Sequence, residues 1–261
     1  MVKISSVAVG SVPLALQHAF QSGTLAASET VCRLQLTDLR QNITMFSEFA
    51  ALADGRSVAH ASPDAGRRVR KAQVIGPVTL LSSETETLQT SIRRIRAALD
   101  TLLDLHPDLD ELWLDEPLLG KAPTDWARLL GNTIRALKSE YLDIRIGVHS
   151  CGPIKQLDLS AIDADAWAFD LDRYWDDILP LWRSQRPEAE LIWSVIPTTG
   201  EAPQHRTAEE LLALHQELQP ERPMRITTAC GLGTRSEDVV RAVLTHQDAL
   251  LAALRSAAGS H

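Results

Sequence analysis

The stretch that decides the fold runs from Glu111 to Cys151 and reads ELWLDEPLLGKAPTDWARLLGNTIRALKSEYLDIRIGVHSC. It opens with a short apolar run, predicted as a strand over Glu111–Leu118, and closes with a second run over Asp143–Cys151. Between them, apolar residues recur at three- and four-residue spacing over Asp125–Tyr141, which is typical of an amphipathic helix. A strand, a covering helix and a second strand together predict a parallel sheet with helices packed on it.

The same alternation continues through the rest of the chain. Further strands are predicted at Ile4–Val12, Ala72–Leu81, Ala166–Leu171, Leu191–Pro197 and Arg225–Leu232, with a weak one near Ser57–His60. The clearest other helices are expected at Glu84–Leu105, Ala208–Leu218 and Ser236–Leu254. This α/β pattern favours a single (β/α)8 TIM-type barrel with one strand short or irregular, forming one catalytic domain over residues 1–261.

Composition and charge exclude several classes of protein. The 261 residues carry a formal net charge of −8, which disfavours binding to nucleic acid or to an anionic membrane. No stretch reaches the roughly 18–20 apolar residues that a membrane span needs. The N-terminus lacks the features of a secretory signal, so we expect a cytoplasmic protein. Three cysteines are better explained as reduced thiols than as a disulfide framework.

Polar residues gather where the predicted strands end, which is where the chemistry of an α/β barrel lies. The residues at these ends include Gly10, Ser11, Asp115, His149, Cys151, Asp170, Thr198 and Cys230. A single glycine follows the first strand, and no Gly-Lys-Ser/Thr loop occurs, which lowers the dinucleotide and P-loop interpretations.

The most specific pattern is the pair His149 and Cys151. Residues i and i+2 of a strand project to the same side, so imidazole and thiol can converge on one ion. Cys230, at the end of a later strand, can supply a third ligand across the barrel mouth. A His/Cys set of three suits zinc, and an open fourth position is typical of a catalytic ion. Asp170 could occupy that position and yield it to a substrate.

Each of these residues also has a structural interpretation. Cysteine is often a small buried hydrophobe, which is how we interpret Cys32, and a His-x-Cys pair can simply pack at a strand end. Asp115 and Glu116 could cap the following loop, and Asp170 could pair with Arg173. Their joint placement at successive strand ends favours the functional interpretation.

Five segments, in this order, resemble the catalytic barrel of the cobalamin-independent methionine synthases. They are VAVGSVP at 7–13, AQVIGPVTLL at 72–81, LWLDEPLL at 112–119, GVHSCG at 147–152 and TACGLGTR at 228–235. The pairing of His-x-Cys with a late Cys-Gly-Leu is the specific part. The Gly-Pro-x-Thr and Asp-Glu-Pro segments also occur in uroporphyrinogen decarboxylase-like barrels.

The resemblance implies a role for each matching residue. His149, Cys151 and Cys230 fall on zinc ligands, and Asp170 falls near the fourth, which is Glu in the family. Asp115 matches an acid that contacts the amino-acid substrate; Asp115 and Asp170 are therefore the predicted catalytic residues. The other residues predicted to bind substrate are Asp38 for the amino group, Gly10 and Ser11 for the carboxylate, and Thr198. The family's Asp-x-His is replaced here by Val195–Thr199.

The implied activity is zinc-dependent methyl transfer to homocysteine or a similar small thiol, giving methionine or another thioether. The methyl donor is left open among folate, methylcobalamin carried by a corrinoid protein, and a small methylated metabolite. Three alternatives also remain open: thiol addition to another electrophile such as an epoxide, carbon–sulfur bond cleavage, and a non-catalytic barrel with structural zinc.

Overall fold

The computed structural model describes residues 4–6, 11–12, 33–34, 59–61, 68–82, 87–105, 109–154, 157–185, 187–203, 206–232 and 235–259. Its strands are β1 (Ile4–Ser6), β2 (Ser11–Val12), β3 (Arg33–Leu34), β4 (Ala59–Ala61), β5 (Arg68–Ile75), β6 (Glu111–Asp115), β7 (Arg145–Ser150), β8 (Ala166–Phe169), β9 (Glu190–Ile196) and β10 (Met224–Thr228). Its helices are α4 (Pro77–Ser82), α5 (Leu88–Leu105), α6 (Thr124–Glu140), α7 (Leu171–Gln185), α8 (Ala208–Leu218) and α9 (Glu237–Gly259). Two 3₁₀ turns, η1 (Leu119–Lys121) and η2 (Leu159–Ala161), complete the set.

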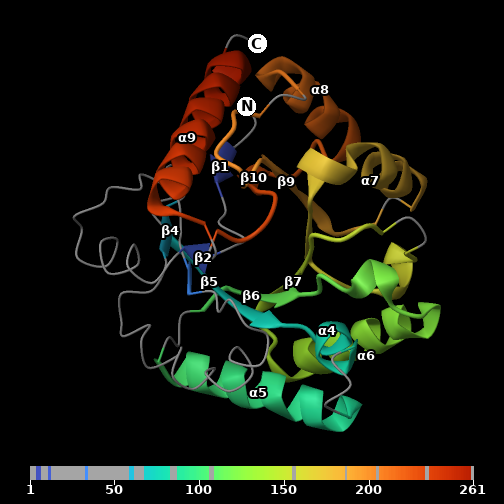
Figure 1. The fold of residues 1–261 in the computed structure, drawn as a ribbon. Coiled ribbons are helices and arrows are strands. Elements are labelled where there is room, and N and C mark those ends of the chain that lie inside the picture. The colour runs from blue at the N-terminus through green and yellow to red at the C-terminus, as the bar shows by residue number, and fades with distance from the viewer. Residues whose placement is uncertain are drawn as a thin grey trace.

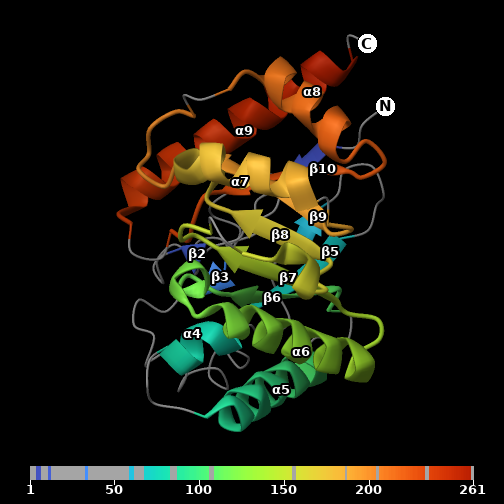
Figure 2. The ribbon, with the colours of Figure 1, turned by 90° about the vertical axis from the view of Figure 1, so that its right-hand side faces the viewer.

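The main sheet has the strand order β1-β10-β9-β8-β7-β6-β5-β4, and β2 pairs separately with β3. Every neighbouring pair of the main sheet is parallel except β4 and β5. The first strand therefore lies beside the last, with Ile4 opposite Met224. Helices cover the outside of the strands (Figures 1 and 2). The predicted TIM-type barrel is confirmed.

Several predicted boundaries need correction. The weak strand near Ser57–His60 exists as β4, but it runs antiparallel to β5 and is no parallel barrel strand. The predicted strand Ala72–Leu81 ends at Ile75, and its remainder is helix α4. Pro77 explains this change, because its fixed φ suits the first turn of a helix. Helix α7 was not among the helices named from the sequence.

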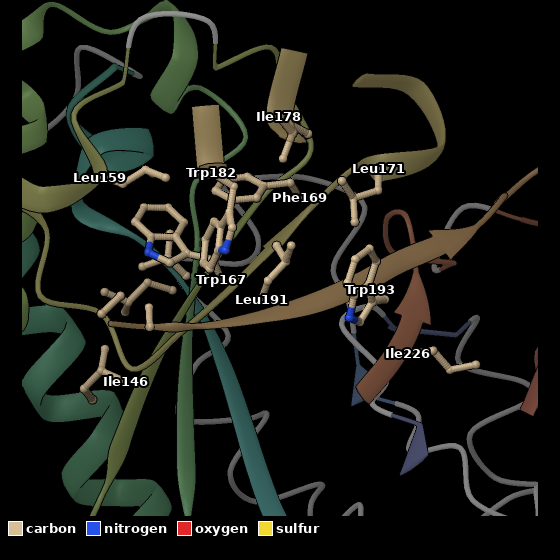
Figure 3. Close-up of a cluster of buried hydrophobic side chains, with 14 of the residues drawn as sticks. Ile146, Leu159, Trp167, Phe169, Leu171, Ile178, Trp182, Leu191, Trp193 and Ile226 are labelled. Carbon is tan, nitrogen blue, oxygen red and sulfur yellow. The ribbon is translucent and has the colours of Figure 1, made fainter. Parts of the chain in front are cut away.

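Side chains on the outward faces of the strands pack against the helices. Figure 3 shows part of this core, where Trp167 stacks on Phe169 at 5.1 Å between ring centroids and Trp182 of α7 meets Phe169 edge-on. All three side chains are almost completely buried. Alternation along β8 places Trp167 and Phe169 on this outer face and Ala166 and Ala168 on the inner one.

Trp113 fills the interior of the sheet and packs with Ala166, Ala168 and Ile192 in a cluster of its own. Small neighbours make room for the indole. A Cβ at Gly147 would approach the Trp113 ring to 2.5 Å. In this cluster one indole packs among smaller side chains.

A layer of charges lies at the opposite end of the strands from the predicted site. Arg225 bonds Glu190 through Nε and Nη2, each at 2.7 Å, and Glu111 through Nη1 at 2.8 Å. Arg145 reaches the same two carboxylates at 2.8 and 2.9 Å. Burial lowers the pKa of Arg225, but the carboxylates of Glu111 and Glu190 outweigh burial and raise it. Two arginines and two glutamates form a neutral, hydrogen-bonded layer.

His215 ties α8 to the sheet and makes stability depend on pH. Its Nε2–H donates to the Arg222 carbonyl at 3.0 Å, and its Nδ1 accepts from Trp193 Nε1 at 3.2 Å. Burial lowers the pKa of His215 below 6.5, so the folded protein holds the ring neutral. The unfolded chain binds a proton below about pH 6.5. The neutral His215 ring therefore contributes to the free energy of unfolding above that pH, and this contribution is lost as the pH falls below it.

Below pH 6.5 we expect the free energy of unfolding of the wild type to fall relative to that of His215→Gln. The fall should be at most about 1.4 kcal/mol per pH unit, which is the limit for the uptake of one proton. Urea unfolding of both proteins from pH 8 to pH 5 measures the difference. Parallel stability curves would contradict the assignment.

Candidate metal site

His149, Cys151 and Cys230 come together at the carboxyl ends of the strands. One ligand atom from each lies within 4.8 Å of the other two. His149 is the fifth residue of β7, and Cys151 directly follows that strand. Cys230 stands two residues beyond β10. Within the described part of the chain, this is the one group of three or more His, Cys, Asp or Glu side chains with such spacing.

Local backbone geometry explains why these side chains converge. Gly147 faces the interior indole of Trp113, so alternation along β7 turns His149 and Cys151 toward the same interior. The Ala229 N–H donates to the Ile196 carbonyl at 2.8 Å, which extends the ladder beyond β10. Thr228 Oγ1 donates to the Cys230 carbonyl at 2.8 Å and fixes the turn that carries the thiol.

The orientation and tautomer of the His149 ring are compatible with metal binding. Its Nδ1 lies 3.1 Å from the Ala168 carbonyl, which can only accept, so Nδ1 carries the proton. In the neutral ring Nε2 then holds the lone pair. A histidine that binds metal commonly donates its other N–H to a backbone carbonyl in this way. The ring is 4% exposed, which restricts its movement.

The two cysteines shift each other's pKa in opposite directions. The hydrogen bond from Cys151 lowers the pKa of Cys230 against the raising effect of burial, and hydrogen bonds with His149 and the Gly231 N–H lower it further. The same bond, burial and the charges of Asp115 and Asp170 raise the pKa of Cys151. Two cysteine sulfurs beside an imidazole are a donor set that fits zinc.

Asp115 lies beside this group. It ends β6, where its register partner on β7 is His149, and its Oδ1 accepts from Gln73 Nε2 at 2.5 Å. Its side chain is half-buried. The predicted acid is therefore placed at the same strand ends as His149 and Cys151.

Asp170 follows β8 and is 5% exposed. Its Oδ1 accepts from the Arg173 N–H at 2.9 Å, so it caps α7. Burial raises its pKa to about 6, against the lowering effects of the bond from the Arg173 N–H and of the Arg173 charge. Asp170 is not part of the three-residue group described above.

The other predicted substrate residues are only partly described. Gly10 and Asp38 lie outside the described residues. The backbone of Ser11 belongs to β2 and pairs with Arg33. Thr198 lies in the loop after β9, where its Oγ1 accepts from Arg235 Nη2 at 3.3 Å. This bond links the loops that follow β9 and β10.

Glu116 follows β6 at these strand ends, and the sequence pattern did not predict a role for it in the site. Its carboxylate is fully buried and accepts from Val78 N at 2.8 Å, Thr79 N at 2.7 Å and Thr79 Oγ1 at 2.7 Å. Burial raises its pKa to about 8, although these three bonds lower it. A Cβ at Gly76 would collide with the carboxylate, so a glycine is needed there. The Glu116 N–H also donates to the His149 carbonyl at 2.7 Å, which joins three strand ends.

No helix in the described ranges combines the length and the apolar character needed to cross a membrane.

Comparison with known sequences and structures supports the fold. No family model and no curated protein matches the sequence. Among solved structures, a protein from Listeria monocytogenes provisionally assigned as a vitamin-B12 independent methionine synthase is 15% identical, with a TM-score of 0.52 over 95% of this chain and 98% of that one. A B12-independent methionine synthase from Shewanella sp. W3-18-1 is 17% identical, with a TM-score of 0.57 over 83% and 68%.

A sugar phosphate isomerase/epimerase from Parabacteroides distasonis also has a TM-score of 0.57, at 11% identity over 97% of this chain and 95% of that one. At these identities the likeness concerns the fold: the chain shares its α/β barrel with enzymes of more than one reaction class.

Proposed function

We propose that this protein is a zinc-dependent enzyme that transfers a methyl group to homocysteine or a similar small thiol, giving methionine or another thioether. The convergence of His149, Cys151 and Cys230 at the carboxyl ends of the strands carries the proposal. In this fold the active site lies at that end. Two structural neighbours bear the name of B12-independent methionine synthases, which agrees with the proposal.

The chemistry follows from the donor set. A free thiol has a pKa of about 8.5 and is mostly protonated at neutral pH, whereas the thiolate is the nucleophile. When bound, zinc keeps a coordinated thiol in its thiolate form at pH 7. His149 would present Nε2 to the metal because Nδ1 is held by the Ala168 carbonyl. Cys151 and Cys230 would bind it as thiolates.

A carboxylate beside the site fits an amino-acid substrate. Asp115, beside His149 in the sheet register, would hold the substrate ammonium. Asp38 would share this role, and Gly10 and Ser11 would hold the carboxylate. Thr198, at the loop after β9, would contact the second substrate. The methyl donor is folate, a corrinoid protein carrying methylcobalamin, or a small methylated metabolite.

Elemental analysis combined with calorimetry tests the proposal. We expect one zinc ion per chain, and homocysteine binding that is lost when zinc is removed and restored when it is returned. Absence of zinc after metal-replete expression would mean that the three ligands are packing residues, and the proposal would fail. Offering the zinc protein a methyl donor and an epoxide with the same thiol then identifies the electrophile.

A further inference from the structure

The carboxylate of Asp170 is engaged by helix α7. Oδ1 accepts from the Arg173 N–H and the main-chain carbonyl accepts from the Tyr174 N–H, each at 2.9 Å. This is the bonding of an N-cap residue, in which the side chain takes one of the N–H groups left over at a helix start. Because the side chain is 95% buried, solvent offers the Arg173 N–H little replacement for this bond.

The first turn of α7 depends on this cap more than most first turns do. Tyr174 has φ −117° and ψ 29°, outside the helical range, so the turn Leu171–Arg173 is separated from the rest of the helix by a kink. A first turn separated in this way gains less stability from the rest of the helix. A shift of Oδ1 of Asp170 toward a metal would therefore break its hydrogen bond with the Arg173 N–H.

The charge of the donor set also bears on Asp170. Two thiolates, from Cys151 and Cys230, balance a divalent zinc ion, and neutral His149 adds no charge. Three protein ligands thus give a neutral site, to which a substrate thiolate can add. A fourth, anionic protein ligand would make the site negative before the thiolate arrives, and like charges repel.

We propose, on the basis of the function proposed above, that Asp170 is a positioning residue rather than a zinc ligand. It holds the first turn of α7 beside the site, while the described residues supply three ligands and the fourth comes from substrate or solvent. The thiol then binds without displacing a side chain. Asp170 is shorter by one methylene than the Glu that the family resemblance would place here, which agrees with this role.

Substitution of Asp170 separates the two roles. Asn caps a helix about as well as Asp but is a neutral, weak ligand for zinc, whereas Ala can do neither. Thr207→Ala is the matched control, because Thr207 caps α8 in the same way, accepting from the Glu210 N–H at 3.2 Å. The measurements are zinc affinity by chelator competition, the visible spectrum of the cobalt-substituted protein, and the melting temperature without metal.

For D170N we expect zinc affinity within about threefold of wild type, an unchanged cobalt spectrum and an unchanged melting temperature. D170A without metal should melt about 2–4 °C lower, and T207A, whose cap is exposed, should melt lower by a smaller amount. A loss of zinc affinity of about tenfold or more in D170N, with an altered cobalt spectrum, would show Asp170 to be a ligand and overturn the inference. A wild-type protein that binds no metal would instead refute the proposed function, and the inference with it.

Discussion

Cys230→Ser should lose most of its zinc and all detectable methyl transfer. Changes to groups that merely support a ligand already cost about 10–100-fold in metal affinity, so loss of a ligand should cost more than about 100-fold. The serine hydroxyl is close to the thiol in size, and Cys230 is only half-buried, so the fold should survive. Elemental analysis and an assay of thiol methylation measure the two effects.

Cys32→Ser is the control for this variant, because Cys32 is expected to lie in the core and has no predicted ligand role. It should retain one zinc ion per chain. In cobalt-substituted protein, the sulfur-to-cobalt absorption should weaken in Cys230→Ser and stay unchanged in Cys32→Ser. Full turnover by Cys230→Ser without bound zinc would contradict the proposed mechanism.

Arg225→Met should lower the free energy of unfolding by about 3–5 kcal/mol, as expected when one partner of a buried ion pair is removed. The variant leaves Glu111 and Glu190 buried, with only Arg145, itself 43% exposed at the side chain, to neutralise two carboxylates. Urea unfolding measures the loss. Arg225→Lys should recover part of it, because lysine keeps the charge without the planar fork that reaches both glutamates.

The surface pair of Arg183 and Glu217 provides the comparison. Its Nε–Oε1 distance of 2.8 Å matches those in the buried layer, but both side chains are about half exposed. Arg183→Met should cost only about 0–1 kcal/mol. Equal losses of unfolding free energy in Arg225→Met and Arg183→Met would show that burial does not increase the contribution of the charge layer to stability.

The convergence of His149, Cys151 and Cys230 could be predicted because it follows from local rules. Alternation along a strand places His149 and Cys151 on one side, and parallel strands end at one edge, which brings Cys230 to them. The overall fold was predictable for a related reason, since apolar strands and amphipathic helices alternate along the chain. Both inferences depend only on positions within single elements and on the fold class.

The features that could not be predicted depend on which distant residues meet. The charge layer consists of residues at or near the starts of four strands: Glu111, Arg145, Glu190 and Arg225. Nothing in their spacing along the sequence shows that they form one layer. The end of β5 was missed because the apolar run continues into α4, where the carboxylate of Glu116, which follows β6, accepts from the first N–H groups.

The pairing of β1 with β10 has a consequence for the order of events during folding. Ile4 has its sheet partner at Met224, so this contact cannot form until nearly the whole chain is available, and closing so long a loop is slow. Cys230 lies just beyond β10, while His149 and Cys151 come from β7. During synthesis, a growing chain presents two of the three proposed ligands long before the third. The convergence of His149, Cys151 and Cys230 should therefore be a late event, coincident with the joining of the first strand to the last.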